Sequence, residues 1–318
     1  MPELPEVETI RRGLSEKIVG KKITDLSFDW LKSFQGDSAD VVGKKVVSVQ
    51  RRAKTIQVEL NDDKNLLFHL KMTGQLIWRS PGFRTQDLGL EKNGEQNNGT
   101  LTLSPKTYDL SPKKGSDFFA GGHPDHDWHL PLPNKHTRIV FTFDDDSKLF
   151  FNDLRKFGWC KVLSSKELLA IHDEKYGLEP FAKEFDVEYL IKFAEKYPNR
   201  KIKQFLLDQT IIAGIGNIYA DEALFAAKIS PYRLARDIDK EEWEKLIIVI
   251  IEILDLAIKK GGTTDSDYVN VDGKKGGMQD FLKVYHKEGE PCANKCGDFV
   301  HRTTIAGRGT HYCPRCQK

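Results

Sequence analysis

The chain opens with the sequence MPELPEVETI at residues 1–10, and we expect the rest of the molecule to be organised around this stretch. Pro5 suits the first position of a helix, where its missing N–H has no partner to lose. Apolar side chains then recur at helical spacing, at Val7, Ile10 and Leu14. The pattern predicts a helix that begins near residue 4, with residues 1–3 projecting in front of its N-terminus.

Pro2 becomes an N-terminal secondary amine if Met1 is removed. An α-amino group has a pKa of about 8, so part of it is free base near neutral pH and can attack an electrophilic carbon. Glu3 and Glu6 lie close by and offer one carboxyl to protonate a sugar oxygen and another to manage water or hold the ammonium. A purely structural alternative is that Pro and Glu suit helix starts through fixed φ and negative charge.

The string from Pro2 to Thr9 resembles the start of the formamidopyrimidine-DNA glycosylase family, which begins Pro-Glu-Leu-Pro-Glu-Val-Glu-Thr. The resemblance implies that Pro2 is the nucleophile and Glu3 the proton donor. We keep Glu6 as a third catalytic candidate. The related endonuclease VIII branch usually differs at the position of Leu4, so this residue favours the branch that acts on purine lesions.

Composition is that of a folded protein: 318 residues, of which 39% are hydrophobic and 30% charged, are enough for two domains. The 49 basic and 47 acidic residues nearly balance, so bulk charge does not indicate a nucleic-acid partner. We find no secretion signal, and Glu252 and Asp255 interrupt the most apolar run, residues 246–258. We expect a cytoplasmic protein, associated with the nucleoid through DNA, and a monomer.

The N-terminal half, residues 1–165, reads as one helix followed by short alternating strands that form an antiparallel β-sandwich. Between two of the strands, residues 80–134 are rich in Gly, Asn, Asp, Ser, Pro and Lys and read as a long insertion. No candidate catalytic residue lies in it, so we expect residues 85–125 to be dispensable for chemistry. The expected strands cover residues 23–28, 46–50, 56–60, 66–77, 138–143, 148–152 and 159–163.

Several residues of this half are candidates for contact with DNA. An enzyme that extrudes a duplex base needs apolar or planar side chains to fill the vacated stack, and Met72, Arg155 and Phe157 are of these types. The resemblance implies that all three enter the helix, that His69 holds a backbone phosphate and that His136 belongs to the same DNA-binding set. It also implies that Lys54, in a basic turn at residues 51–54, reaches the active site.

The C-terminal half is predicted to be helical over residues 189–282, after a linker at residues 166–188. Helices at about residues 201–208 and 218–228 flank the turn Gly214-Ile215-Gly216-Asn217, which suggests a close backbone approach. The segment resembles the helix–two-turn–helix of the same family, and Asn217 inherits its phosphate-binding role. A long core helix follows at residues 239–260, then a polar loop at 263–277 that the resemblance closes over the everted base, and a strand at 281–285.

Residues 283–318 contain two cysteine pairs, C-x3-C and C-x2-C, separated by sixteen residues. This spacing predicts a ribbon in which four thiolates bind one structural Zn²⁺, at Cys292, Cys296, Cys313 and Cys316. The module has seven Lys or Arg and three Asp or Glu, a local charge of +4 that suits DNA. The resemblance places Arg308, at the tip between the pairs, on the phosphate next to the lesion and in catalysis.

Together these patterns predict an α+β protein with an N-terminal sandwich, a helical helix–two-turn–helix domain and a zinc ribbon. The resemblance implies a bifunctional DNA glycosylase and abasic-site lyase that acts on duplex DNA containing oxidised purines such as 8-oxoguanine and formamidopyrimidines. Two alternatives remain. One is an endonuclease VIII-like enzyme for oxidised pyrimidines, and the other is a zinc-ribbon protein that binds damaged DNA without catalysis.

Overall fold

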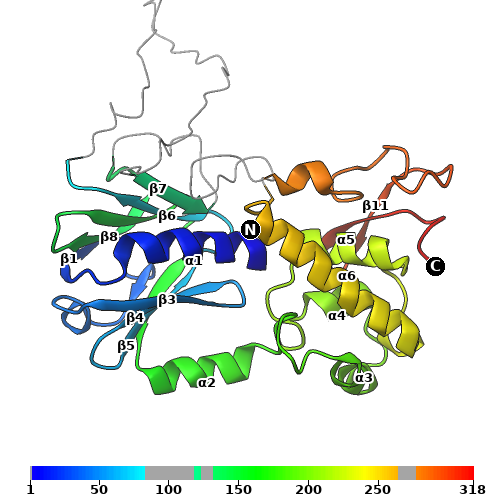
Figure 1. Cartoon of the computed structure of the whole chain (residues 1–318), viewed down its shortest axis with the longest axis horizontal. Helices are drawn as coiled ribbons and strands as arrows, with labels where there is room; N and C mark the ends of the chain where they lie inside the picture. The colour runs from blue at the N-terminus through cyan, green and yellow to red at the C-terminus, as the bar shows by residue number, and fades with distance from the viewer. Residues whose placement is uncertain (1, 83–117, 123–131, 264–276) are drawn as a thin grey trace, which may run out of the picture.

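The structure, a computed structural model, describes residues 2–82, 118–122, 132–263 and 277–318. It confirms the predicted fold class: a β-sandwich with one long helix forms the N-terminal half, and helices with a β-hairpin form the C-terminal half (Figure 1). The two halves lie side by side, and the N-terminal end of the first helix lies at their junction. Residues 2 and 3 are therefore placed between the halves.

The sandwich consists of two five-stranded sheets, ordered β1-β8-β9-β6-β7 and β2-β10-β5-β4-β3. All neighbouring strands are antiparallel except β2 and β10, which are parallel. The strands are β1 (Ile23–Phe28), β2 (Phe34–Gln35), β3 (Val46–Arg52), β4 (Thr55–Leu60), β5 (Lys64–His69), β6 (Gly74–Arg79), β7 (Phe118–Gly122), β8 (Thr137–Phe143), β9 (Lys148–Asp153) and β10 (Trp159–Leu163).

Helix α1 (Leu4–Ile18) begins near residue 4, as the sequence predicts, with Pro5 in its first turn, and packs beside the edge strands β3 and β7. Its apolar face is completely buried in the same core as the inner residues of both sheets. The rings of Phe141 and Phe151 meet Phe68 edge to face at 5.9 and 6.0 Å in this core. Because the apolar stripe of α1 joins the sandwich core, the position of its N-terminus is fixed by burial.

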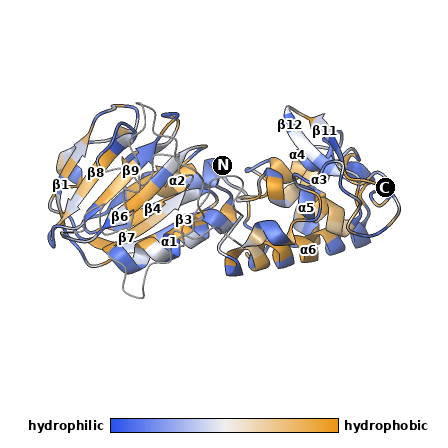
Figure 2. Cartoon of the chain, turned by 90° about the horizontal axis from the view of Figure 1, so that it is seen from above, coloured by the Kyte–Doolittle hydropathy of each residue, from blue (hydrophilic) through white to orange (hydrophobic). Residues whose placement is uncertain are grey.

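The C-terminal half surrounds a second core, in which Trp243 packs against Phe205 with ring centroids 5.4 Å apart. Figure 2 shows hydrophobic residues along the strands of the sandwich and on these helices, whereas the β11–β12 hairpin is mostly hydrophilic. No helix within the described ranges has the length and apolar character to cross a membrane. The elements are α2 (Ser165–Lys175), α3 (Val187–Lys196), α4 (Ile202–Leu207), α5 (Asn217–Ala227), α6 (Lys240–Lys259), β11 (His301–Ile305) and β12 (Arg308–Tyr312), with short 3₁₀ turns η1 (Ser38–Asp40), η3 (Ala235–Asp237) and η4 (Met278–Phe281).

The structure corrects four expectations about secondary structure. The expected strand at residues 66–77 is two strands, β5 and β6, which belong to different sheets. Strand β7 lies inside the segment expected to be an insertion, and its five residues are buried against β6 and α1. Helix α2 occupies much of the expected linker, and Ser164 and Glu167 cap its start. The expected strand at residues 281–285 is absent from the described residues, because the N–H groups of residues 283–285 donate to the Glu222 carboxylate instead of a strand ladder.

These corrections restrict the part of the insertion that can be removed. Replacing residues 83–117 with a short Gly/Ser connector should change the free energy of unfolding by about 1 kcal/mol or less. Each halving of the length of a loop changes the free-energy cost of closing it by only about 0.6 kcal/mol. The single-turnover cleavage of damaged duplex that the resemblance implies should stay near that of the parent protein. Thermal unfolding and a rapid-quench assay would measure both quantities.

The control deletion extends through β7, to residue 122. It removes the buried rings of Phe118 and Phe119, which should cost at least about 3 kcal/mol. A large loss of cleavage by the shorter replacement, with its stability intact, would show that residues 83–117 contribute to the site.

Candidate active site

The start of α1 is held against the glycine turn that precedes α5. The Leu4 N–H donates to the Gly214 carbonyl oxygen at 3.1 Å. A Cβ at Gly216 would lie 2.2 Å from Cδ of Glu3, and one at Gly214, where φ is +99°, would lie 2.6 Å from Leu4 Cδ1. The turn therefore needs glycine at both positions, because only a bare backbone lets it approach this closely. Pro2 is consequently buried at the junction of the two halves.

Glu3 has the environment of a proton donor. It is 3% exposed, and its Oε1 accepts a hydrogen bond from the Ile218 N–H at 3.0 Å. Its Oε2 is buried and has no hydrogen-bond partner in the described part of the chain. Burial raises the pKa of Glu3, and the opposing charge of Lys54 offsets only part of that shift. A carboxyl in this state retains its proton to higher pH than an exposed glutamate and can deliver it to a bound substrate.

Glu6 instead fastens the helix start in place. Its Oε2 accepts from the Glu3 N–H at 2.9 Å, and its Oε1 accepts from the Tyr219 hydroxyl at 2.5 Å and the Thr263 N–H at 2.8 Å. Burial and the adjacent Glu6 raise the pKa of Tyr219 well above its ordinary value, so the phenol remains a donor. Glu6 thus connects α1 to α5 and to the end of α6.

Lys54 reaches the same junction from the β3–β4 hairpin. Its side chain is 7% exposed, and its Nζ donates to the Ile215 carbonyl oxygen at 2.7 Å. Burial lowers the pKa of Lys54 to about 8, the charge of Glu3 opposes this shift and the charge of Arg308 adds to it. The basic turn does not project into solvent, because Lys54 points into the interface between the halves.

A residue that sequence reasoning missed, Glu179, holds this hairpin from the segment between the halves. Its Oε1 accepts from the Ala53 N–H and from Arg51 Nη1, both at 2.6 Å, and its Oε2 accepts from Arg51 Nη2 at 2.8 Å. Ala53 has a left-handed backbone with φ +53°, which is uncommon for a residue with a Cβ. Glu179 stabilises this turn and so positions Lys54, the next residue.

Two neighbouring loops present the residues expected to enter DNA. Met72 is 38% exposed and Phe157 is 53% exposed, although both are large apolar side chains. The guanidinium of Arg155 lies 4.8 Å from the Phe157 ring centroid. Exposed apolar groups beside a cation suit insertion into a base stack.

Asp153, which the sequence did not single out, joins these two loops. Its Oδ1 accepts from the Thr73 hydroxyl, and its Oδ2 accepts from the Gly158 N–H at 2.7 Å. The Thr73 hydroxyl oxygen also accepts from the Arg155 N–H at 3.0 Å. One buried carboxylate therefore fixes the loop of Met72 relative to the loop of Arg155 and Phe157.

The two histidines lie at the base of these loops. His69 Nδ1 accepts from the Lys71 N–H at 3.1 Å, so the ring proton is on Nε2. Burial, with the charges of Lys71 and Lys54, lowers the pKa of His69 to about 3, which makes it a neutral donor at physiological pH. The His136 carbonyl oxygen accepts from the Asp153 N–H at 2.8 Å, which places His136 next to the organising carboxylate.

Asn217 lies at the first turn of α5 and contacts the hairpin of the C-terminal module. Its Nδ2 donates to the Gly309 carbonyl oxygen at 2.8 Å, one residue from the exposed Arg308. A fully buried ion pair supports this contact: Lys203 Nζ lies 2.6 Å from Asp221 Oδ1 and also donates to the Asn217 carbonyl oxygen. The structure thus brings Asn217 and Arg308 together, as candidates for binding phosphate.

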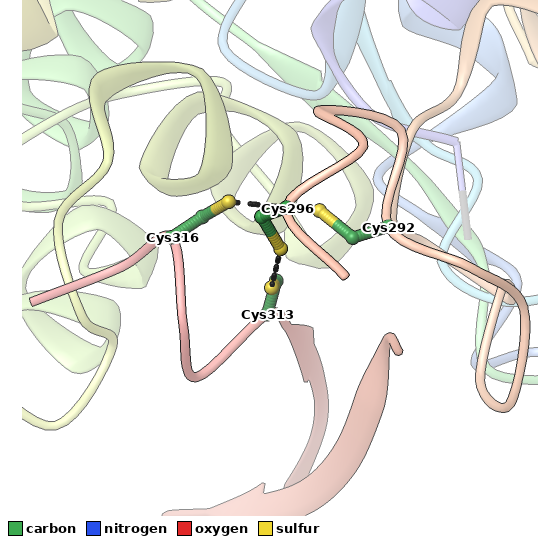
Figure 3. Close-up of side chains that lie close together, drawn as sticks. All are labelled: Cys292, Cys296, Cys313 and Cys316. Atoms are coloured by element: carbon green, nitrogen blue, oxygen red, sulfur yellow. Dashed lines mark hydrogen bonds between the residues drawn. The ribbon is translucent and has the colours of Figure 1, made fainter. Parts of the chain in front are cut away.

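The four cysteines converge at one point in the C-terminal module (Figure 3). The Sγ atoms of Cys292 and Cys316 are 3.6 Å apart, those of Cys296 and Cys313 are 3.5 Å apart, and all four lie within 4.8 Å of one another. Zn–S bonds of about 2.3 Å in a tetrahedron require S···S distances of about 3.8 Å, so the thiol set fits zinc. The longer C-x3-C spacing is compatible with this geometry.

Models of known protein families match in three consecutive segments. Residues 1–160 match the formamidopyrimidine-DNA glycosylase N-terminal domain, residues 176–268 match the H2TH domain of the same glycosylase, and residues 289–318 match a zinc finger found in FPG and IleRS. The chain belongs to the formamidopyrimidine-DNA glycosylase family. Its four cysteines form the structural zinc site of that zinc finger.

Relatives and solved structures agree over the full length of the chain. Formamidopyrimidine-DNA glycosylases of Streptococcus mutans and Carboxydothermus hydrogenoformans are 36% and 37% identical, with 100% of each chain covered. A Lactococcus lactis FPG variant in complex with a Fapy-dG-containing DNA superposes with a TM-score of 0.78, at 32% identity and full coverage of both chains. MutM in complex with DNA containing carbocyclic 8-oxo-G gives a TM-score of 0.77, at 33% identity and again full coverage.

The loop expected to close over the base, residues 263–277, lies outside the described residues except at its two ends. Met1 also lies outside the described residues. All other candidate residues from the sequence are described.

Zinc should be required for the ribbon to hold Arg308. Cys313→Ala should remove stoichiometric zinc and weaken binding of damaged duplex by at least about tenfold, because metal binding supplies on the order of 10 kcal/mol to the folding of such modules. Metal analysis and a fluorescence-anisotropy titration would measure the two effects. Cys160→Ala is the matched control, since Cys160 lies in the sandwich core and should leave the zinc content unchanged. Full duplex affinity in zinc-free Cys313→Ala would contradict the expectation.

Proposed function

We propose that this chain excises oxidised purines from duplex DNA and then cleaves the strand at the abasic site, with Pro2 as the nucleophile. The observation that carries the proposal is the buried Glu3 carboxyl, whose Oε2 has no hydrogen-bond partner within the described residues, one residue from the N-terminal proline. Related glycosylases bind DNA containing Fapy-dG or carbocyclic 8-oxo-G, which supports oxidised purines as substrates. The protein would act in the cytoplasm, at the nucleoid.

The chemistry follows from an amine that can attack the sugar carbon C1′ and a protonated carboxyl that lies close to that amine. The free base of Pro2 attacks C1′, the glycosidic bond breaks, and its electron pair leaves with the base. The Pro2 nitrogen passes its remaining proton to the departing base, and its lone pair then expels the ring oxygen O4′, which takes the proton of Glu3. The product is an iminium between Pro2 and C1′ with an opened sugar.

The iminium acidifies the proton on C2′. Loss of this proton breaks the C3′–O3′ bond, and a second elimination breaks the C5′–O5′ bond, so the strand is left with a one-nucleoside gap. Water then hydrolyses the iminium and regenerates the Pro2 amine. We assign Lys54 and Arg308 to charge stabilisation and proton transfer during these eliminations, since the electrostatics of the site couple both residues.

We assign binding of the DNA backbone to His69, Asn217 and Arg308. The neutral His69 offers its Nε2–H to a phosphate oxygen, and Arg308 offers a charged donor at the ribbon tip. Met72, Arg155 and Phe157 would fill the stack that the base leaves, with His136 next to the carboxylate that positions their loops.

Removal of the inserted side chains should affect extrusion more than chemistry. Met72→Ala and Phe157→Ala should slow excision from duplex by at least about tenfold but slow cleavage at a preformed abasic site much less, because extrusion costs a few kcal/mol and a missing base reduces that cost. Single-turnover assays on the two substrates measure the ratio. Leu169→Ala is a matched control, since this exposed apolar side chain lies on α2, which carries no candidate site residue. Equal loss on both substrates would indicate a general binding defect.

A panel of single-lesion duplexes tests the substrate class. We expect cleavage of 8-oxoguanine and formamidopyrimidine duplexes to exceed cleavage of duplexes with oxidised pyrimidines. The reverse order would support the endonuclease VIII-like alternative. Binding of damaged duplex with no cleavage of any member would support a non-catalytic zinc-ribbon protein.

A further inference from the structure

The turn between β1 and β2 presents side chains that the proposed mechanism does not use. Leu31 at its tip is 80% exposed, more than any other large hydrophobic side chain in the described residues. The turn itself is well ordered by hydrogen bonds: the N–H and the hydroxyl of Ser33 donate to the Trp30 carbonyl oxygen at 2.8 and 2.6 Å. Lys32 is exposed next to Leu31. We call residues 30–32 the Trp30 turn.

The Trp30 turn is mounted beside the loop of Arg155 and Phe157. Lys156, between those two residues, places its Nζ 4.7 Å from the centroid of the Trp30 ring, within the range of a cation–π contact. Lys156 has a left-handed backbone, with φ +58°. The two tips are therefore in direct contact.

Hydrogen bonds from Arg138 and Cys160 hold both tips in place. Arg138 Nε donates to the Asp153 carbonyl oxygen at 2.9 Å, and Arg138 Nη1 lies 3.1 Å from Asp29 Oδ2. At the other end of the turn, the Cys160 N–H donates to the Ser33 carbonyl oxygen at 2.7 Å. One buried arginine thus joins the residue before the Trp30 turn to the residue that organises the insertion loops. The position of one tip relative to the other is therefore fixed.

The chemistry of the Trp30 turn suits DNA. Lys32 supplies a cation for a phosphate, and Leu31 supplies an apolar surface for the edge of a deoxyribose. The nearest carboxylate in the sequence, Asp29, is paired with Arg138 and so does not oppose this charge. The turn also contacts Lys156, which lies between Arg155 and Phe157, the residues assigned above to insertion.

We propose that the Trp30 turn is a further DNA contact, in which Lys32 and Leu31 hold the duplex that flanks the site of base insertion. This inference rests on the proposed function, because it takes the adjacent loop as the one that enters the duplex. Its role is to keep the flanking DNA in place while the inserted side chains occupy the stack.

The test is duplex affinity of the double variant Leu31→Ala/Lys32→Ala. Fluorescence anisotropy with a duplex that carries a tetrahydrofuran abasic analogue, repeated over a range of salt, should give about tenfold weaker binding and a salt dependence shallower by about one unit. The matched control is Leu169→Ala/Lys245→Ala, which makes the same exchanges at exposed positions of α2 and α6 and should bind within about twofold of the parent protein. Double variants that bind alike would overturn the proposal.

Shortening the duplex locates the contact. If the Trp30 turn holds flanking DNA, the affinity ratio between parent protein and Leu31→Ala/Lys32→Ala should fall to one when the duplex is trimmed past the turn from one end. A ratio that is the same at every length would overturn the proposal, since it would indicate an indirect effect on the lesion site. The proposed function has a separate readout: failure of the parent protein to form a borohydride-trapped adduct would contradict that function, whatever the double variants do.

Discussion

Protein that retains Met1 should form no covalent adduct with damaged DNA when borohydride is added during turnover. In that form the Pro2 nitrogen is part of a peptide bond, so its lone pair is delocalised into the carbonyl and cannot form an iminium. Processed protein with a free Pro2 should give the adduct on its N-terminal peptide. We expect at least about a thousandfold difference in single-turnover cleavage, because the whole covalent pathway depends on this amine. Gel electrophoresis measures the amount of adduct, and peptide mapping identifies the peptide that carries it.

Lys54 is the competing nucleophile in this experiment. Its pKa of about 8 leaves part of the population as free amine near neutral pH, and it lies at the same junction. We expect Lys54→Ala with a free Pro2 to remain trappable, since the attacking amine is intact. Duplex binding by the Met1-retaining form should persist, because it depends on Asn217, Arg308 and the zinc ribbon. A crosslink on Lys54 in the unmutated, processed protein would transfer the nucleophile role to that residue.

The features that the sequence predicts well are those whose signals are local. The helix start next to Pro5 depends on a few adjacent residues, and the zinc site depends on two short cysteine pairs, so the sequence predicts both within a residue or two. Helix α2 has an equally local signal, the capping box of Ser164 and Glu167, which could have been found. Strand β7 also has one, because Phe118–Gly122 is a short apolar run within polar sequence.

The positioning residues could not be found in this way, because their partners are distant along the chain. Asp153 bonds to a hydroxyl 80 residues earlier, and Glu179 bonds to a backbone N–H 126 residues earlier. Each is a single carboxylate in a polar stretch, where solvent exposure is the ordinary expectation. Only folding reveals that these carboxylates fix the loops on which Met72 and Lys54 lie. The candidate catalytic residues were named by family resemblance, but their mutual arrangement needed the structure.

Glu3→Gln should suppress base excision by about 10² to 10⁴-fold while reducing cleavage at a preformed abasic site much less. Proton donation to O4′ opens the sugar and makes loss of the base irreversible, whereas an abasic sugar already opens to its aldehyde. The pH profile should change as well. In the parent protein the raised pKa of Glu3 makes excision fall as pH rises through that pKa, because the proton donor is lost. Excision by Glu3→Gln should show no such fall with rising pH. Single-turnover rates over a pH series, on lesion and abasic duplexes, measure both effects.

Stability separates this effect from a folding defect. The native pKa of Glu3 is raised above the unfolded value of 4.5, so the native state binds more protons in that window and stability falls as pH rises through it. Glu3→Gln removes the buried charge that the parent protein carries above the Glu3 pKa, so at those pH values the variant should unfold at the same or a higher temperature than the parent protein. The matched control is Glu6→Gln. Its side-chain NH₂ would face one of the donors that now bond to the Glu6 carboxylate, and this mismatch should lower the free energy of unfolding by about 1 to 3 kcal/mol. Loss of stability in Glu3→Gln as large as in Glu6→Gln would make Glu3 a structural residue and contradict its assignment as the acid.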